Sequence, residues 1–380
     1  MKILIASEFR CSIYKGKYYL APKAYSIYKR YADAFGDVIL CSRFEEKDFL
    51  NDGYCEATFI KEIINIEKLS EVIVGKYKKE IITKIQECDL VIVRAPSMIA
   101  FKTANYAQKK KVPYLLEAMG DAWDSYWNHS IIGKCIAPYM YFSMKKVCRN
   151  SNYCIFVTKY HLQKRYPSLN KGINASNVAI NNFNEQIIQN RIKRIKNMDP
   201  RNISLMTTAG VNVKAKGHVY VIKAIKQLKK EGINVTYYLA GGGNKDYLLK
   251  KVKKYKVEKN IVFLGELSMN EVYKYLDNID IYVQPSLQEG LPRAIIEAMS
   301  RACPCIGSKT GGTPELLDNQ FIFRRKSSSA IVDAIHLILK SNIEEVAARN
   351  YEESKKYDEH ILNKKRNLYF QKIKDELEGK

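Results

Sequence analysis

Short apolar runs alternate with stretches of helical periodicity through the first half of the chain. Runs that are apolar at every position are typical of strands buried on both faces. Helical periodicity appears between them, as over residues 22–35 and 70–87. The pattern predicts a parallel sheet covered by helices on both faces. Its expected strands are residues 2–6, 38–41, 89–93, 113–118 and 153–158.

A second series of strands begins after residue 200. Apolar runs at residues 203–210, 235–240 and 261–264 each lead into glycine, and residues 219–230 have helical periodicity. Glycine loops between a strand and a helix bring ligand groups to the carboxyl edge of a doubly wound sheet. The charged stretch 185–201 is interpreted as a linker between the two series.

The length of the chain supports the same division. A chain of 380 residues exceeds what one hydrophobic core usually serves. We therefore expect an N-terminal α/β domain over residues 1–185 and a C-terminal α/β domain over residues 200–345. Charged helices are expected over residues 346–380.

Several features of the composition predict a cytoplasmic protein. The first apolar run is too short for a signal peptide and lacks a small-residue cleavage site. No stretch approaches the ~18–20 apolar residues that span a bilayer. The nine cysteines show no paired metal-ligand spacing, and an odd number without a secretion signal favours reduced thiols.

The formal net charge is +23, and the basic excess is spread over both halves of the chain. Nucleic-acid binding predicts clustered Lys and Arg interleaved with aromatic residues or a recognisable reader motif, and the sequence has neither. Such a charge suits an enzyme that acts at an anionic membrane surface on a diphosphate substrate. A general bias toward Lys, Ile, Asn and Tyr explains it equally well.

The segment from Gln284 to Met299 carries the most specific chemistry. A strand pattern ends at Gln284, a Glu-Gly-Leu-Pro turn follows, and Pro292 suits the first position of a helix. A helix N-terminus after a glycine loop binds phosphate through free backbone N–H groups. Glu289 and Glu297 would repel a phosphate, so they are interpreted as acceptors for sugar hydroxyls. The alternative is that they only complement the helix dipole.

The spacing of Glu289 and Glu297 resembles the E-x7-E signature of glycosyltransferase family 4, whose members are retaining nucleotide-sugar glycosyltransferases. The block at residues 311–315, Gly-Gly-Thr-Pro-Glu, resembles the next loop and helix start of that family. The layout of the whole chain resembles the GT-B fold, in which two Rossmann-like doubly wound domains face each other across a cleft. In that fold the N-terminal domain takes the acceptor, the C-terminal domain takes the donor, and the last helix typically crosses back.

The resemblance also implies roles for single residues. Lys216 matches the phosphate-binding Lys of the family, which neutralises charge on the leaving diphosphate. Glu289 would contact the donor sugar or lie at the reacting face, and Glu297 would accept hydrogen bonds from the ribose hydroxyls. Lys216 and Glu289 are therefore candidate catalytic residues. The backbone positions implied at the donor are Gly16, Gly210, Gly241, Gly265, Leu267, Gly290 and Leu291.

One departure from the family pattern concerns the second cation at the diphosphate. The family usually has an Arg directly after the glycine that corresponds to Gly210, and Val211 stands there in this chain. Lys214 or Arg293 would have to supply that charge. The resemblance implies neither a metal ion nor a cofactor beyond the donor.

The acceptor side is predicted from the loop after residues 113–118. Asp121 and Asp124 lie beside Trp123, so the acids could orient an acceptor hydroxyl, with Asp121 as a third catalytic candidate, while Trp stacks on a sugar ring. The alternative is a turn that caps a helix, with the Trp residues in the core. This loop resembles that of bacterial polysaccharide-assembly members of the family.

Residues 132–149 combine aromatic residues and Met with a basic end. Such a stretch predicts either a helix in a membrane interface or a helix packed on its own sheet.

The favoured function is a retaining hexosyltransferase. It would use a nucleotide-sugar donor and a carbohydrate acceptor, free or lipid-linked, in bacterial surface polysaccharide synthesis, at the inner face of the plasma membrane. A nucleotide-sugar epimerase of the same fold is the alternative, and a basic nucleic-acid-binding protein is less favoured.

Overall fold

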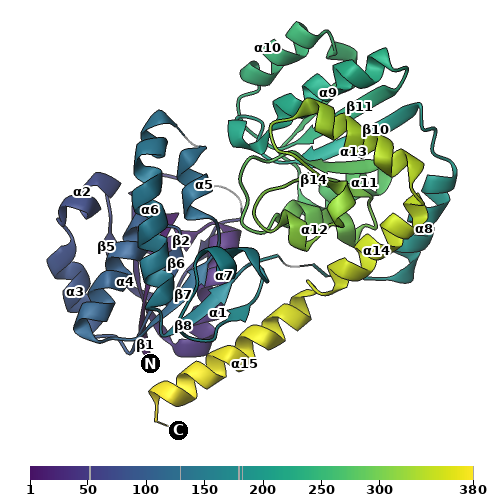
Figure 1. The fold of residues 1–380 in the computed structure, drawn as a ribbon. Helices are drawn as coiled ribbons and strands as arrows, with labels where there is room; N and C mark the ends of the chain where they lie inside the picture. Colours follow the sequence, from purple (N-terminus) through teal and green to yellow (C-terminus); the bar gives the residue numbers. More distant parts are fainter. Residues whose placement is uncertain (51–52, 129, 179, 182, 380) are drawn as a thin grey trace. The chain divides into compact units, whose positions relative to one another are not determined.

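The computed structural model describes residues 1–50, 53–128, 130–178, 180–181 and 183–379. The described chain divides into two compact α/β units (Figure 1). The first comprises residues 1–127, 131–175 and 363–380, and the second comprises residues 128–130 and 176–362.

In the first unit, nine strands of the described residues form one sheet. Seven of them run parallel in the order β5-β3-β1-β6-β7-β8-β9, and β2 and β4 pair antiparallel beyond β1. The strands are β1 (Lys2–Tyr14), β2 (Lys17–Leu20), β3 (Asp37–Glu46), β4 (Cys55–Glu56), β5 (Ile60–Asn65), β6 (Leu90–Ala95), β7 (Tyr114–Ala118), β8 (Tyr153–Phe156) and β9 (Ile173–Asn174).

β1 is longer than the apolar pattern predicts. Its first residues pair in parallel with β3 and β6, and beyond a register shift after Ala6 its end pairs antiparallel with β2. Lys15 and Gly16 form the turn of this hairpin with φ of 48° and 71°, as a two-residue hairpin turn requires. The hairpin was not predicted, because polar residues after Ala6 interrupt the apolar run.

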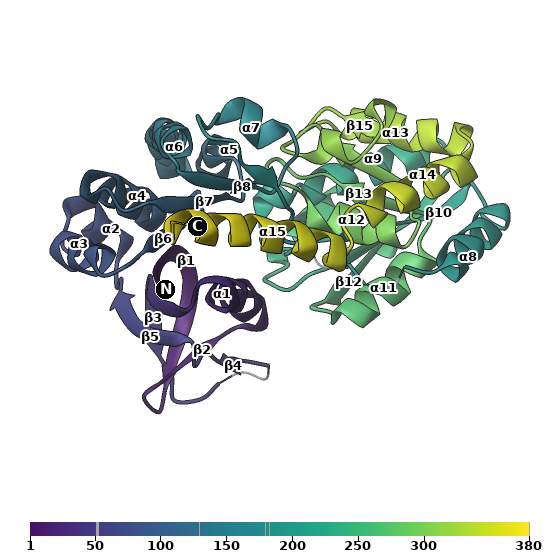
Figure 2. The same cartoon turned by 90° about the horizontal axis from the view of Figure 1, so that it is seen from below.

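The helices of the first unit cover both faces of its sheet (Figure 2). α1 and α15 share one face, where Phe370 contacts Tyr31 and Phe35 at ring distances of 5.5 and 5.2 Å. The helices are α1 (Pro22–Phe35), α2 (Leu69–Val74), α3 (Lys78–Gln86), α4 (Met98–Lys110), α5 (Ala122–Trp127), α6 (Ile131–Arg149), α7 (His161–Arg165) and α15 (Glu359–Leu377).

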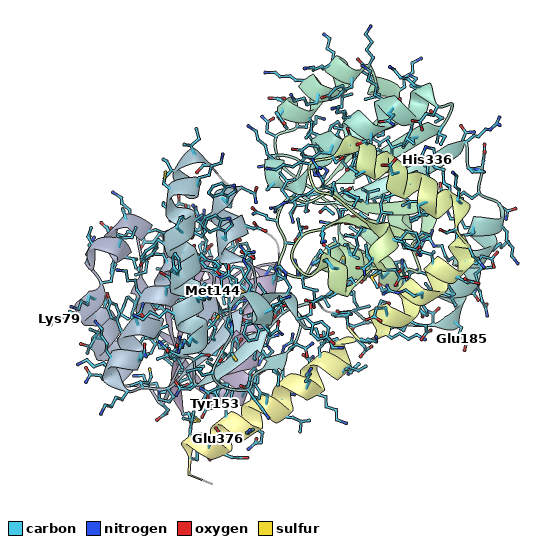
Figure 3. The ribbon with its side chains drawn as sticks, in the orientation of Figure 1. Lys79, Met144, Tyr153, Glu185, His336 and Glu376 are labelled. Carbon is cyan, nitrogen blue, oxygen red and sulfur yellow. The ribbon has the colours of Figure 1, made fainter. Side chains whose placement is uncertain are left out.

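α15 packs on the first unit although it ends the chain. Tyr153 of β8 lies close to Glu376 of α15 (Figure 3), and burial together with the hydrogen bond to Glu376 raises the pKa of Tyr153 to about 12. Tyr369 and Ile373 join the same core. The second predicted helix of this unit is divided, because Gly75 takes a left-handed conformation between α2 and α3.

In the second unit, six described strands form a wholly parallel sheet in the order β12-β11-β10-β13-β14-β15. This is the doubly wound order of a Rossmann fold, in which the first three strands are added toward one edge and the next three toward the other, so that the strand order reverses between the first strand and the fourth. The strands are β10 (Asn202–Thr208), β11 (Asn234–Ala240), β12 (Ile261–Gly265), β13 (Ile281–Gln284), β14 (Cys305–Ser308) and β15 (Ile322–Phe323).

Helices cover both faces of this second sheet as well (Figure 1). α9, α10 and α13 contribute the apolar side chains of one core layer, which includes Leu205, Tyr237 and Ile281 from the strands. The helices are α8 (Glu185–Lys196), α9 (His218–Lys230), α10 (Asp246–Tyr255), α11 (Met269–Asn278), α12 (Arg293–Ser300), α13 (Ser328–Lys340) and α14 (Ile343–Lys355).

The interpretation of residues 185–201 as a linker is wrong, because most of them form α8 of the second unit. Arg191 is buried and donates to the carbonyl oxygens of Leu276 and Ile279, at 2.5 and 2.6 Å. Arg194 forms an ion pair with Asp280 at 2.9 Å. The charges that suggested a solvated linker therefore satisfy carbonyl groups at the end of α11. The division near residue 175 also precedes the predicted boundary at residue 185.

Candidate active site

The candidate site lies where the strand order of the second sheet reverses, between β10 and β13. β10 and β13 are neighbours at this point, and the loops that follow them reach α9 and α12. In open parallel sheets, ligands bind outside the carboxyl ends of the strands at such a switch point. The predicted catalytic residues Lys216 and Glu289 belong to these two loops.

The two loops pack directly on each other. The N–H of Leu287 donates to the carbonyl of Ala215 at 2.7 Å. Gly217 has φ of +75°, and a Cβ atom there would come within 2.0 Å of the carbonyl oxygen of Pro285. Only glycine allows this approach, so the loop after β10 is held against the loop after β13.

Lys216 and Glu289 form an ion pair. The Lys216 Nζ lies 2.7 Å from Glu289 Oε1, and the side chains are 30% and 11% exposed. The same oxygen accepts a hydrogen bond from Gln284 Nε2 at 3.0 Å. The structure thus brings together two of the three side chains that the sequence predicted as catalytic, and Asp121 lies in the first unit.

A third loop supports the one that carries Glu289. Gly311 has φ of +49°, and a Cβ atom there would come within 2.2 Å of the carbonyl oxygen of Glu289. The N–H of Gly312 donates to the carbonyl of Gly290 at 2.6 Å. The glycine pair predicted as the next loop of the motif therefore shapes the Glu-Gly-Leu-Pro turn.

α12 places the other acid of the motif. Pro292 is the N-cap rather than the first helical residue, and Arg293 opens the helix, half-buried. Gly290 and Leu291 lie just before this N-terminus, where free N–H groups can meet a phosphate. Glu297 is half-buried near Tyr273 of α11, where burial and then the Glu297 charge raise the pKa of the tyrosine.

A cavity of about 500 Å³ opens beside the loop after β10. Its volume is within the range of small-molecule sites, about 300–1,000 Å³. The cavity is lined by backbone and a few polar groups at the ends of three strands. The lining residues are Thr208, Ala209, Gly210, Asn212, Ala240, Gly241, Gly242, Gly243, Glu266, Leu267 and Val272.

The predicted glycines account for the shape of this cavity. A Cβ atom at Gly241 would come within 2.1 Å of the carbonyl oxygen of Ala209. Gly265 has φ of +74° and accepts from the N–H of Gly241 at 2.7 Å. Gly265 lines a neighbouring cavity of about 510 Å³ that shares Gly241. The structure therefore brings Gly210, Gly241 and Leu267 around one cavity and places Gly265 next to it.

Lys214 and Arg293 are the two residues expected to supply the second cation at the diphosphate. Lys214 is exposed, and its Nζ lies 5.0 Å from the centre of the Tyr247 ring, a cation–π contact. Arg293 stands at the start of α12, on the same loop as Gly290 and Leu291. Which of the two meets a diphosphate stays a prediction.

Two buried polar groups of this site were missed in the sequence. Gln284 is the last residue of β13 and is buried. A polar residue at the end of an apolar strand is the sequence feature that could have identified it as a site residue. His218 opens α9, and its Nδ1 lies 3.0 Å from Tyr237 Oη. Burial lowers the pKa of His218 to about 4, so this histidine is neutral at pH 7.

In the first unit, Asp121 links the start of α5 to Arg165 of α7 and to Tyr166. It is 1% exposed, and its oxygens accept from the N–H of Asp124 at 3.1 Å and from Tyr166 at 2.9 Å, and pair with Arg165 at 2.9 Å. Burial alone would raise its pKa, but the hydrogen bonds from His161 and the Asp124 N–H, with the Arg165 charge, lower it. The structure thus contains the capping turn of one predicted alternative, and a contact of Asp121 with an acceptor stays a prediction.

The two Trp residues are not in the core, contrary to one predicted alternative. Trp123 stacks on Trp127 with ring centres 5.1 Å apart and an interplanar angle of 16°, and Trp127 is 39% exposed. Asp124 is buried. Contact of Trp123 and Asp124 with an acceptor stays a prediction.

Gly16 lies at the hairpin turn of β1 and β2, with open space around its Cα. The turn by itself requires its positive φ, and its predicted place at a diphosphate stays a prediction.

The described part of the chain contains no group of three or more His, Cys, Asp or Glu side chains that could hold a metal ion. None of its helices is long and apolar enough to cross a membrane.

Comparison with known proteins gives consistent matches. The family model for "Glycosyl transferases group 1" matches residues 189–357. Protein CapJ of Staphylococcus aureus is 31% identical over 379 residues, which are 97% of this chain and 91% of CapJ. The putative colanic acid biosynthesis glycosyltransferase WcaL of Salmonella typhimurium is 30% identical over 123 residues, which are 30% of each chain.

Solved structures match over nearly the whole chain. A sucrose-phosphate synthase from Thermosynechococcus elongatus has a TM-score of 0.68 at 13% identity and covers 98% of both chains. Anabaena HepE in complex with UDP has a TM-score of 0.65 at 16% identity, over 98% of this chain and all of HepE. These similarities confirm the predicted GT-B fold.

Proposed function

The chain belongs to the group 1 glycosyl transferases, and from this we propose that it moves a hexosyl unit from a nucleoside-diphosphate sugar to a carbohydrate acceptor with retention at the anomeric carbon. The protein is an enzyme of the glycosyltransferase class. The observation that carries the proposal is the Lys216–Glu289 ion pair at the switch point, beside a cavity of about 500 Å³.

The donor occupies the second unit in this proposal. The nucleoside enters the cavity lined by Gly210, Gly241 and Leu267, where four of the eleven lining residues are glycine. The diphosphate meets the N–H groups of Gly290 and Leu291 at the start of α12. That HepE was solved with UDP and with UDP-glucose supports a nucleotide-sugar donor and makes UDP-sugars the first to test.

The chemistry follows from the charges at the reacting bond. The bond between the anomeric carbon and the diphosphate oxygen breaks, and the acceptor oxygen takes the place of the diphosphate on that carbon. The proton of the acceptor hydroxyl passes to an oxygen of the leaving diphosphate. The diphosphate gains negative charge as it leaves, and Lys216 stabilises that charge. Its ammonium has three N–H donors, so it can turn from Glu289 toward a phosphate oxygen as the diphosphate leaves. Glu289 then faces the anomeric carbon, where positive charge develops.

Polysaccharide assembly is the proposed setting. The amylovoran biosynthesis glycosyltransferase AmsK of Erwinia amylovora and WcaL are named for such pathways, although the chain spans less than a third of their lengths. The proposed acceptor is a growing saccharide, free or lipid-linked, bound by the first unit near Trp123, Asp124 and Asp121.

Release of nucleoside diphosphate from a panel of UDP-, GDP- and ADP-sugars tests the proposal. One nucleotide class should be hydrolysed slowly without acceptor and faster with saccharide acceptors, and the anomeric configuration of the product can be read by NMR. An epimerase would instead return a different nucleotide sugar. If no member of the panel is turned over and titration calorimetry detects no nucleotide binding, the proposal is wrong.

The exposed side chains of α6 support a second proposal, that the protein binds a membrane surface. The inner face of α6 is buried and includes Met144 (Figure 3), while the residues exposed on its outer face are mostly apolar over the first turns, where Lys134 is also exposed, and basic at the end. We define the α6 outer face as Ile131 (82% exposed), Ile132 (72%), Tyr139 (48%), Phe142 (65%), Lys145, Lys146 and Arg149.

The proposed occupant of the α6 outer face is an anionic bilayer surface. Exposed apolar side chains enter the headgroup region, and basic side chains beside them meet anionic lipid. Trp127, which is 39% exposed and has Lys134 Nζ 5.8 Å from its ring centre, extends the same chemistry. A protein bound in this way at the inner face of the plasma membrane would meet a lipid-linked acceptor there.

A further inference from the structure

Gln284 is a buried polar residue directly before the loop that carries Glu289. It is 2% exposed, whereas Ile281 and Val283 of the same strand enter the core of the second unit. Strand alternation places Tyr282 and Gln284 on the opposite face of β13. A buried amide costs free energy unless its hydrogen bonds are made, so its partners show what holds it.

Both the nitrogen and the oxygen of the Gln284 side-chain amide are hydrogen-bonded. Its Nε2 donates to Glu289 Oε1 at 3.0 Å and to Ser286 Oγ at 2.9 Å. Its Oε1 accepts from Tyr282 Oη at 2.8 Å. Tyr282 is fully buried, and its oxygen accepts from the N–H of Thr208 at 3.3 Å. A chain of hydrogen bonds therefore runs from the end of β10 through Tyr282 and Gln284 to Glu289.

Only one orientation of the amide suits this chain. Reversing it would turn the amide oxygen toward the Glu289 carboxylate and the amide nitrogen toward the Tyr282 hydroxyl, which already accepts from Thr208. The first contact would be repulsive, since a carboxylate has no proton to give. Gln284 is thus fixed as a donor to Glu289.

We propose that Gln284 is a positioning residue for Glu289, with Tyr282 as its support. This inference rests on the proposed role of Glu289 at the anomeric carbon. Gln284 holds Oε1, and among the described residues Oε2 has no hydrogen bond, so that this oxygen is the one presented to the donor sugar.

The second contact of Oε1, Lys216, serves a different purpose. Lys216 is a flexible cation, 30% exposed, and the leaving diphosphate competes for it. Gln284 is uncharged, buried and held on its other side by Tyr282, so the diphosphate does not draw it away. The carboxylate therefore keeps its orientation while Lys216 follows the leaving group.

Steady-state kinetics of the full-length protein tests the inference, with the best substrate among UDP-glucose, UDP-N-acetylglucosamine, GDP-mannose and ADP-glucose. Gln284→Met keeps the length and burial of the side chain and removes both donors. It should lower kcat about tenfold or more while KM and the affinity for the free nucleoside diphosphate change less than threefold. Tyr282→Phe should lower kcat by a smaller factor.

A double-mutant cycle separates positioning from a general loss of structure. If Gln284 acts through Glu289, Gln284→Met should change kcat less than twofold in a Glu289→Gln background. Equal fold-changes in both backgrounds, or a kcat for Gln284→Met like that of the unmodified protein, would overturn the inference. If Glu289→Gln itself leaves kcat unchanged, the proposed role of Glu289 fails, and this inference fails with it.

Discussion

Lys216 and Glu289 stand 73 positions apart in the sequence, and their charged atoms meet at 2.7 Å. Each side chain is supplied by a loop that follows a central strand, and the loops are held together by the contact between Gly217 and Pro285. A cation and an acid at one sheet edge can stabilise the two opposite charges that develop when the bond between a sugar and a diphosphate breaks. The cation stabilises the leaving diphosphate, and the acid stabilises the positive anomeric carbon.

Replacing Lys216 by Ala should lower kcat about ten- to a thousandfold, because compensation of the growing diphosphate charge is lost. Lys214→Ala is the matched control, since Lys214 is a neighbouring exposed lysine that contacts Tyr247. Its effect on kcat should be much smaller. Equal activity of the two variants would show that Lys216 is not the phosphate contact.

Replacing Glu297 by Ala should weaken binding of the nucleoside diphosphate by about 1.5–3 kcal/mol, the usual worth of a charge-assisted hydrogen bond. Titration calorimetry measures this directly. Glu352→Ala, which removes an exposed acid on α14, should leave the affinity unchanged. An unaltered affinity for Glu297→Ala would remove this acid from the ribose.

Replacing Gly311 by Ala should lower the free energy of unfolding of the second unit by more than the cost of placing Ala in a left-handed backbone conformation. Gly232 is the matched control, since its φ is +80° and no atom lies within 4 Å of an added Cβ. Gly232→Ala should cost about 1 kcal/mol for the left-handed backbone. Gly311→Ala should cost about 2 kcal/mol more, because the Cβ would clash with the Glu289 carbonyl. Urea unfolding of both variants gives the difference, and equal costs would contradict the close packing of the two loops.

His218 should make stability depend on pH. Burial lowers its pKa to about 4 in the folded protein, against 6.5 when unfolded. As pH falls below 6.5 the unfolded chain binds a proton that the folded chain does not, so the free energy of unfolding falls, by up to about 3 kcal/mol near pH 4. Urea unfolding at pH 7 and pH 5 should show a smaller loss for His218→Gln than for the unmodified protein. Identical losses would mean that His218 titrates normally.

The α6 outer face should bind vesicles that contain anionic lipid and release them as salt rises, since charge attraction is screened within ~10 Å at 0.1 M. Replacing Lys145, Lys146 and Arg149 by Gln should weaken binding to such vesicles by about 1 kcal/mol per charge at most. Sedimentation with neutral and anionic vesicles measures this binding. Activity on a short soluble acceptor should not change.

The control for α6 replaces Lys109, Lys110 and Lys111, an exposed basic group at the end of α4. The same change of charge there should have little effect on vesicle binding. Equal losses from both triple variants, or no preference for anionic vesicles at low salt, would leave composition bias as the better account of the net charge.

Much of the fold followed from the sequence because its signals are local. The apolar runs and helical periodicity predicted most central strands, and α1 begins and ends where the periodicity does. The spacing of Glu289 and Glu297, with the glycine pair after them, identified the family without any contact being known. The same local reasoning failed for α8, since its charged residues look solvated until the carbonyl groups that Arg191 binds are in place.

The tertiary structure decided which residues act together. Periodicity places Gln284 at the end of a strand, but only the folded loop after β13 brings Glu289 to its amide. Only the packing of β10 beside β13 gives its other partner, Tyr282, the N–H of Thr208. Asp121 was predicted as a catalytic candidate from its place after a strand. Only the folded chain gives it Arg165, Tyr166 and the N-terminus of α5 as partners. A hydrogen bond or an ion pair needs two groups at a set distance. The sequence determined the groups, and the folded chain determined the distances.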